Sequence, residues 1–140
     1  MTKATPLALR KRFHCVYQLD YHLVLVTKYR KKCLTSAMLE RIEDSARERC
    51  QSRDGVLVTF NGEADHVHLL LSLPPHIALS EYVNALKTNT ARMLRRDFAS
   101  DLAPFYSEPV LWSRSYGVFS SGGASLAVLK NYIKSEDRPL

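Results

Sequence analysis

The chain has no long apolar run and no paired cysteines. No hydrophobic run approaches the roughly 18–20 residues that a membrane-spanning helix needs, and residues 1–6 lack the continuous apolar stretch of a secretory signal. Cys15, Cys33 and Cys50 are odd in number and widely spaced, which argues against both a disulfide framework and a zinc-binding pair. We therefore expect a reduced, cytoplasmic protein without a membrane partner.

Acidic residues are scarce at the beginning of the sequence. Residues 1–32 hold eight Lys or Arg residues and one acidic residue, a net charge of +7, whereas residues 33–140 sum to −1 within the total of +6. This asymmetry favours a polyanionic partner, with nucleic acid as the first candidate, although a basic tail that only aids solubility is the alternative. With 140 residues, 46% of them hydrophobic, we expect one domain over 1–140, in which residues 1–13 form a basic arm.

Two periodicities divide the chain into strands and helices. Apolar residues alternate at every second position at 15–25 and again at 66–73, which predicts two strands with one buried face each. Apolar residues three or four apart predict helices, the first capped by Thr35 or Ser36 and the second by Ser80. The expected order is a strand at 15–25, a helix ending at Asp54-Gly55, strands at 56–60 and 66–73 joined by an Asn61-Gly62 turn, a helix from Ser80, a loop at 100–109, a strand at 110–119, a joint at 120–123 and a last helix at 124–136.

This β-α-β-β-α-β order followed by one extra helix predicts an α+β protein with ferredoxin-like (RRM-like) architecture. Four antiparallel strands would carry two helices on one face, and the first and third strands would form the central pair. The uncovered face would then present His66 and His68 from the third strand, beside Asp20 and His22 from the first. An open sheet face is therefore the expected place for a functional site.

The sequence His66-Val67-His68 is the sharpest local feature of the chain. Alternate residues of a strand share a face with their Cβ atoms roughly 7 Å apart, so two imidazoles can converge on one metal ion. Histidines at this spacing also occur as ordinary polar residues on a wet sheet face. Asp65 can orient one imidazole as a hydrogen-bond acceptor, or can simply close the preceding turn. The remaining histidines, His14, His22 and His76, receive no metal role.

One face of the last expected helix carries two side chains that could take part in catalysis. Tyr132 and Glu136 stand four residues apart, about one helical turn, so a phenol and a carboxylate lie on the same face. Leu126, Leu129 and Ile133 form a separate, apolar stripe. A surface tyrosine beside a surface glutamate is the plain alternative for this helix taken alone.

Several blocks of the sequence together resemble a known family. The resemblance is carried by residues 21–30 (YHLVLVTKYR), 65–71 (DHVHLLL) and 111–116 (LWSRSY), and by Gly122-Gly123 followed by residues 130–133 (KNYI). These blocks are similar to those of the transposases of small single-strand insertion sequences of bacteria and archaea, the TnpA group of single-tyrosine HUH endonucleases. The likeness runs from about Tyr17 to Glu136, in the order and at the spacing of the family.

The resemblance implies a metal-dependent DNA enzyme. It implies that His66 and His68 bind Mg²⁺ or Mn²⁺, and that Tyr132 attacks a DNA phosphodiester to give a 5′-phosphotyrosine and a free 3′-hydroxyl that later reverses the reaction. Hard cations prefer oxygen ligands, and the family takes one from the residue four after its tyrosine, usually a glutamine but here Glu136. A carboxylate binds such a cation well but adds negative charge beside a phosphate, so a catalytically inactive relative stays open as an alternative.

The resemblance also implies partners. Members of the family work as homodimers, in which a tyrosine helix can complete the site of the partner, and they recognise imperfect hairpins in single-stranded DNA; no small-molecule substrate is expected, and the activity would be associated with the nucleoid. Gly122 and Gly123 would be the hinge of this helix, although a tight turn explains them equally well. The side chains expected to contact DNA phosphates are Lys28, Arg30, Lys31 and Lys32 at the end of a strand, and Lys87, Arg92, Arg95 and Arg96 on a helix, where a solvated face is the alternative.

Two other functions fit part of the same pattern. A replication-initiator or relaxase-type HUH nickase uses the same chemistry, but such enzymes usually carry further domains, for which 140 residues leave no room. A non-catalytic RNA-binding module uses the same fold, but it places aromatic side chains on the open face of the central strands. The sequence places His66 and His68 there instead.

Overall fold

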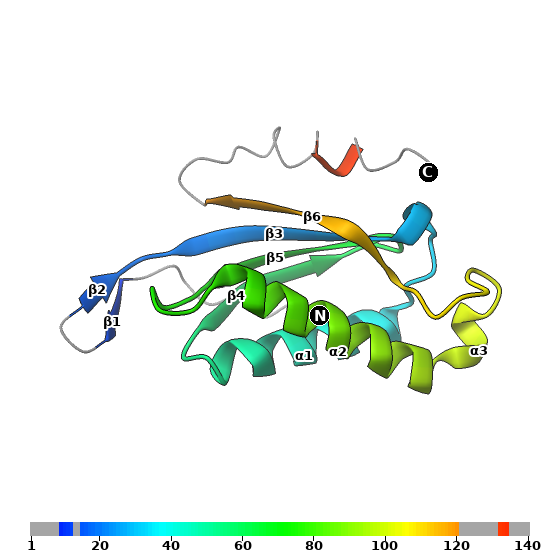
Figure 1. The fold of residues 1–140 in the computed structure, drawn as a ribbon, viewed down its shortest axis with the longest axis horizontal. Helices are drawn as coiled ribbons and strands as arrows, with labels where there is room; N and C mark the ends of the chain where they lie inside the picture. The colour runs from blue at the N-terminus through cyan, green and yellow to red at the C-terminus, as the bar shows by residue number, and fades with distance from the viewer. Residues whose placement is uncertain (1–8, 13–14, 121–131, 135–140) are drawn as a thin grey trace.

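A computed structural model describes residues 9–12, 15–120 and 132–134, and its main feature is a four-stranded antiparallel sheet with two helices on one face (Figure 1). The sheet has the order β4-β5-β3-β6, formed by β3 (Asp20–Thr27), β4 (Val56–Gly62), β5 (His66–Ser72) and β6 (Trp112–Ser120). The covering helices are α1 (Ser36–Gln51) and α2 (Leu79–Asp97). The central strands β3 and β5 are the first and third of this sheet along the chain, so the ferredoxin-like prediction is confirmed.

The hydrophobic core lies between the sheet and the two helices. Alternate residues of β3 and β5 face α1 and α2, as the period of two predicts, and the helices return one apolar stripe each. Fully buried members of this cluster are Leu23, Leu25, Leu69, Leu71, Ile42, Ala46, Tyr82 and Leu86. Burial of each large aliphatic side chain contributes roughly 1.5–3 kcal/mol, so the alternation decides which sheet face is covered. Within the described ranges, no helix is long and apolar enough to cross a membrane.

The start of the chain differs from the prediction of one long strand at 15–25. The strand divides at Gln18 and Leu19 into β2 (Cys15–Tyr17) and β3, and β2 pairs with β1 (Arg10–Arg12) in a separate two-stranded sheet. Part of the expected basic arm is therefore a β-strand, and Arg12 forms an exposed ion pair with Asp54 at 2.5 Å. The alternation of apolar residues continues across this break. It predicts which side chains share a face, but it does not predict which strand each segment pairs with.

Two local expectations are wrong. Asn61 and Gly62 belong to β4, and the turn follows at residues 63–65, where the Glu63 amide donates to the His66 carbonyl at 2.9 Å. A Cβ at Gly62 would meet Leu39 Cδ2 at 2.6 Å, so this glycine lets β4 pass close to α1. Ser80 lies inside the first turn of α2, which begins after Ala78 without a side-chain cap.

The boundaries of α1 follow the sequence signals. Thr35 is the residue that caps α1, because its hydroxyl accepts a hydrogen bond from the Met38 amide at 3.3 Å. The turn that follows the helix places Asp54 in the left-handed region, with φ of 59°. The Asp54-Gly55 stop is therefore confirmed.

The connection from α2 to β6 contains the short helix α3 (Ala99–Leu102), which replaces the start of the loop expected at 100–109, and β6 begins at Trp112 rather than at residue 110. Trp112 is buried, and its indole Nε1 donates to Thr90 Oγ1 at 2.9 Å. The same hydroxyl donates to the Leu86 carbonyl at 2.7 Å. Thr90 thus satisfies a buried donor of β6 from the middle of α2.

Replacing Thr90 by Val should destabilise the protein, because it leaves the buried Trp112 indole without its acceptor. We expect a loss of about 1–3 kcal/mol in the free energy of unfolding, measured by urea titration. Thr88→Val makes the same change at an exposed position of α2 and supplies the matched control. Equal losses in the two variants would show that helix propensity, and not the hydrogen bond, dominates.

Candidate active site

The sheet face opposite α1 and α2 carries the predicted histidines. Cα partners across the central strands are Val24 with His68 and Val26 with His66, so both histidines share a face with the two valines. His66 and His68 are both half-buried, and Val24 and Val26 form a small apolar cluster beneath the site. The placement expected from the alternation is therefore found.

His22 directly contacts His68. The Nδ1 atom of His22 lies 2.9 Å from Nε2 of His68, and the ring centroids are 5.1 Å apart. Burial lowers the pKa of His22 below the usual 6.5. Burial, and then the charges of His22 and His66, lowers the pKa of His68 in the same way. Both rings are therefore neutral at pH 7, and one of the two facing nitrogens donates to the other.

No metal role is expected for His22 from the sequence, and its contact with His68 is not predictable from the local pattern. His22 is paired with Leu70, so it reaches His68 along a diagonal between neighbouring strands. The contact between His22 and His68 therefore becomes evident only from the register of β3 and β5.

His66 is oriented by the residue that precedes it. Asp65 Oδ1 lies 2.9 Å from His66 Nδ1, and Asp65 Oδ2 accepts from Arg30 Nε at 3.0 Å. Burial acts to raise the pKa of Asp65, but the hydrogen bonds from His66 and Arg30 and the charge of Arg30 outweigh it, so the pKa lies below its usual value. The ionised carboxylate accepts at His66 Nδ1 and leaves Nε2 as the lone-pair donor of that ring.

Tyr132 lies on the same sheet face, within its own chain. Residues 132–134 are helical and lie on the side of the sheet opposite α1 and α2 (Figure 1). The Tyr132 ring packs on Gly117, where a Cβ would meet Tyr132 Cε2 at 2.7 Å, and edge-on against Phe119 with centroids 5.9 Å apart. Gly117 pairs with Val24, whose other Cα partner is His68. One residue of β3 therefore separates the tyrosine position from the histidine position.

Arg30 connects the tyrosine segment with the histidine pair. Its Nη1 donates to the main-chain carbonyl of Ile133, the residue after Tyr132, while its Nε and Nη2 hold Asp65 at 3.0 Å. The Arg30 side chain is only 12% exposed. One guanidinium therefore bridges the segment that carries the phenol and the carboxylate that orients His66.

Three of the predicted site residues lie outside the described ranges. These are Glu136, Gly122 and Gly123, together with most of the expected helix at 124–136. Within residues 9–12, 15–120 and 132–134, no three His, Cys, Asp or Glu side chains converge to hold a metal ion. The donor set nevertheless fits a divalent ion in part, because Asp65 leaves one nitrogen of His66 available and His68 is neutral. Two imidazoles need at least one oxygen ligand to favour a hard cation.

The basic residues expected to contact DNA fall into different environments. Lys31 and Lys32 are exposed after the 3₁₀ turn η1 (Lys28–Arg30), whereas Arg30 is turned inward. Lys87 is half-buried, and its Nζ donates to the Ser113 and Arg114 carbonyls at 2.8 and 3.1 Å. Burial lowers the pKa of Lys87. The geometry therefore favours internal roles for Arg30 and Lys87.

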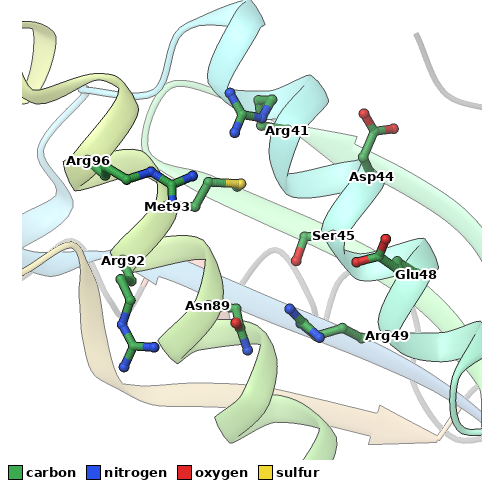
Figure 2. A pocket seen from close by; sticks show the side chains of 9 residues that line it. All are labelled: Arg41, Asp44, Ser45, Glu48, Arg49, Asn89, Arg92, Met93 and Arg96. Atoms are coloured by element: carbon green, nitrogen blue, oxygen red, sulfur yellow. The ribbon is translucent and has the colours of Figure 1, made fainter.

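A groove of about 410 Å³ between α1 and α2 contains other members of the expected basic set (Figure 2). Arg92 and Arg96 line it from α2, and Arg41 and Arg49 line it from α1. Acidic groups partly offset this charge, since the groove also contains carboxylates from α1 and Arg96 pairs with Asp97 at 2.8 Å. All of its lining residues belong to α1 and α2, which cover the other face of the sheet (Figure 1), so the groove is separate from the histidine face.

The fold and the site define a ferredoxin-like protein whose open sheet face combines a His-x-His pair with a tyrosine carried by a C-terminal helical segment. The chain belongs to the IS200-like transposase family: the family model described as "Transposase IS200 like" matches residues 15–136. It is 31% identical over 131 residues to the ISDra2 transposase TnpA of Deinococcus radiodurans, covering 94% of this chain and 93% of that protein. It is 28% identical over 123 residues to the IS200 transposase of Salmonella typhimurium, covering 88% and 80%.

Solved structures agree with this assignment. A crystal structure from Deinococcus radiodurans R1, described as that of a transposase, superposes with a TM-score of 0.80 at 31% identity, covering 91% of this chain and 97% of that one. The REP-associated tyrosine transposase bound to a REP hairpin superposes with a TM-score of 0.56 at 12% identity, covering 91% and 68%, which shows a shared fold. The resemblance found in the sequence is confirmed, and the chain is a transposase, a DNA-binding enzyme of DNA transposition.

The two neighbouring imidazoles make stability depend on pH in a defined direction. Because the pKa values of His22 and His68 lie below 6.5, the unfolded chain binds protons that the folded chain excludes as pH falls through this value. Without metal, the free energy of unfolding should therefore decrease from about pH 7.5 to about pH 5.5, by at most about 1.4 kcal/mol per pH unit for each histidine. The lowered pKa of Asp65 keeps that carboxylate ionised throughout this window.

Urea unfolding in EDTA across this pH range tests the expectation. His68→Gln should flatten the dependence, and His76→Gln, at an exposed position, should leave the wild-type slope in place. A slope that is the same in His68→Gln as in the wild type would contradict the interpretation.

Proposed function

We propose that this transposase cuts and rejoins single-stranded DNA at the ends of its insertion sequence through a 5′-phosphotyrosine intermediate. Tyr132 is the proposed nucleophile, and His66, His68 and Glu136 are the proposed ligands of Mg²⁺ or Mn²⁺. The observation that carries this proposal is the packing of Tyr132 on Gly117, beside Val24 and therefore one residue of β3 from His68. The link from Arg30 to Ile133 and Asp65 also supports it, because it joins the nucleophile segment to the histidines.

The reaction exchanges one phosphodiester for another. The Tyr132 oxygen bonds to phosphorus and loses its proton, while the bond from phosphorus to the 3′-oxygen breaks and that oxygen gains a proton. The phosphotyrosine retains the energy of the broken bond, so a later attack by a 3′-hydroxyl restores a DNA strand and releases the phenol. Because an ordinary tyrosine has a pKa near 10, the phenol requires help at neutral pH.

A bound divalent cation would polarise the phosphate and stabilise the charge that develops on its oxygens and on the leaving 3′-oxygen. Three side chains of this chain could act as ligands of that cation. Asp65 orients His66 and leaves its Nε2 to offer a lone pair, and the neutral His68 ring offers one from Nδ1 in the tautomer whose Nε2 donates to His22. Glu136 would add the oxygen ligand that a hard cation requires.

The proposed partners are single-stranded DNA with hairpin ends and a second copy of the chain, while no small-molecule substrate is proposed. The exposed lysines Lys31 and Lys32, with Lys28, would hold phosphates at the end of the histidine face, and Arg92, Arg95 and Arg96 would hold phosphates on α2. Binding of a REP hairpin by a transposase with the same fold is consistent with a hairpin ligand. Gly122 and Gly123 are the proposed hinge of the terminal helix.

The rival RNA-binding module has less support. Such modules stack bases on aromatic rings of the central strands. Over their full lengths, β3 and β5 place no Phe, Tyr or Trp on the open face, where the side chains are Asp20, His22, Val24, Val26, His66, His68, Leu70 and Ser72. A replication-initiator or relaxase-type nickase shares the proposed chemistry, but the family match supports the transposase.

A covalent adduct should form between the protein and labelled single-stranded DNA from the ends of its element. We expect the adduct with Mn²⁺ or Mg²⁺, its loss with EDTA and in Tyr132→Phe, and none with duplex DNA of the same sequence. Denaturing gel electrophoresis detects it directly. Tyr116→Phe removes a hydroxyl from the helix-facing side of β6 and is the matched control. An adduct that persists in Tyr132→Phe would assign the nucleophile elsewhere.

Binding to single-stranded DNA should weaken with salt in proportion to the number of phosphate contacts. The slope of log K against log salt is expected to change by about 0.7 for each contact removed, so Lys32→Ala should reduce it by about that amount. Arg53→Gln is the control, because Arg53 is already held by Glu81 at 2.5 Å. Fluorescence anisotropy at several salt concentrations measures the slopes, and an unchanged slope in Lys32→Ala would remove that lysine from the interface.

A further inference from the structure

A small pocket next to the histidine site combines exposed aromatic rings with lysines. It has a volume of about 240 Å³, and its lining includes Lys28, Tyr29, Lys31 and Phe105, with Glu108 as the one carboxylate. Tyr29 is 48% exposed and Phe105 is 36% exposed, which makes them two of the large hydrophobic side chains left open to solvent in the described part of the chain. Neither ring is used by the core or by the site described above.

The backbone of η1 is held in a conformation that directs these side chains. Tyr29 and Arg30 have φ of 61° and 54°, in the left-handed region that non-glycine residues rarely adopt. The turn is fixed from both sides, because Tyr106 Oη donates to the Lys28 carbonyl at 2.7 Å and Arg30 is anchored on Asp65. Strain that the surroundings maintain in this way is typical of functional positions. Here its result is an inward Arg30 and an outward Tyr29.

The chemistry of the pocket matches a nucleotide. An exposed aromatic ring offers its face to a base, and lysines beside it offer charge to the flanking phosphates. Lys28 Nζ already lies 5.4 Å from the centre of the Tyr29 ring, so ring and ammonium are available in one place. The two lysines exceed the single Glu108 carboxylate, which leaves the pocket positive.

We propose that this pocket binds one nucleotide of single-stranded DNA, with the base stacked on Tyr29 and the phosphates beside Lys28 and Lys31. The inference rests on the proposed function, since only an unpaired strand can present the face of a base. The position of the pocket also supports this inference. Arg30, the residue after Tyr29, contacts both Asp65 beside His66 and Ile133 beside Tyr132, so the pocket adjoins the proposed cleavage site. The pocket would hold the substrate strand next to the bond that is cut.

Two oligonucleotides of equal charge separate stacking from phosphate binding. The probes are labelled dT12 and an abasic 12-mer with the same number of phosphates, with affinities measured by fluorescence anisotropy without metal. Tyr29→Ala should weaken dT12 binding by at least about 5-fold, the lower end of the stacking contributions found by alanine substitution, and leave abasic binding unchanged. Tyr29→Phe should bind dT12 like the wild type. Lys31→Ala should weaken both probes and reduce the salt slope.

The strained backbone provides a second test, which a purely structural tyrosine would fail. Asn tolerates the left-handed conformation better than Tyr, so Tyr29→Asn should melt at a temperature equal to or above that of the wild type while losing dT12 affinity. Lower stability in Tyr29→Asn would assign Tyr29 to the fold and overturn the proposal. So would equal loss of both probes in Tyr29→Ala, or no detectable binding of dT12 by the wild type.

The outcomes also separate this inference from the proposed function. Stacking in the pocket without a Tyr132 adduct would support the nucleotide site and reject the cleavage chemistry. An adduct whose rate and substrate affinity are unchanged in Tyr29→Ala would support the chemistry and reject the nucleotide site.

Discussion

The arrangement of the histidine face depends on one guanidinium. Arg30 binds the Asp65 carboxylate with Nε and Nη2 and the Ile133 carbonyl with Nη1. Asp65 orients His66, and Ile133 follows Tyr132, so the two halves of the proposed chemistry share one planar group. A lysine could not replace it, because an ammonium offers a point charge and no fixed fork. Removing one partner of such a poorly exposed pair generally costs about 3–5 kcal/mol, which explains why the neighbouring backbone can be held under strain.

That strain links the interior of the site to its edge. The left-handed φ values of Tyr29 and Arg30 reverse the direction of successive side chains, which sends Tyr29 outward to the pocket beside Phe105 and the next residue, Arg30, inward to Asp65. Any substitution that relaxes η1 therefore acts on two places at once. The same turn ends β3, the strand that carries His22 and Val24, so the histidine face and the candidate nucleotide pocket are consecutive parts of one segment.

Features that follow from strand alternation and from the order of helices and strands were predictable from the sequence. The contacts of long side chains with residues distant in the sequence were not. Alternation along β3 and β5 was enough to place His66 and His68 on the open face, because strand periodicity alone decides that choice. The four cations at residues 28–32 looked equivalent in the sequence, yet Arg30 is turned inward while Lys31 and Lys32 are exposed. Long flexible side chains select partners distant in sequence, and local patterns do not encode those partners.

Gly117 is unfavourable for a strand, but the packing of Tyr132 requires it. Glycine weakens a strand interior, since it has no side chain to pack and loses more conformational freedom on folding. At this position a Cβ would lie 2.7 Å from the Tyr132 ring, and the strand partner of Gly117 is Val24, whose other partner is His68. The missing side chain therefore leaves the space that the phenol ring occupies beside the histidine pair. A larger residue at position 117 would stabilise β6 as a strand, but its side chain would push the Tyr132 ring away from the histidine face.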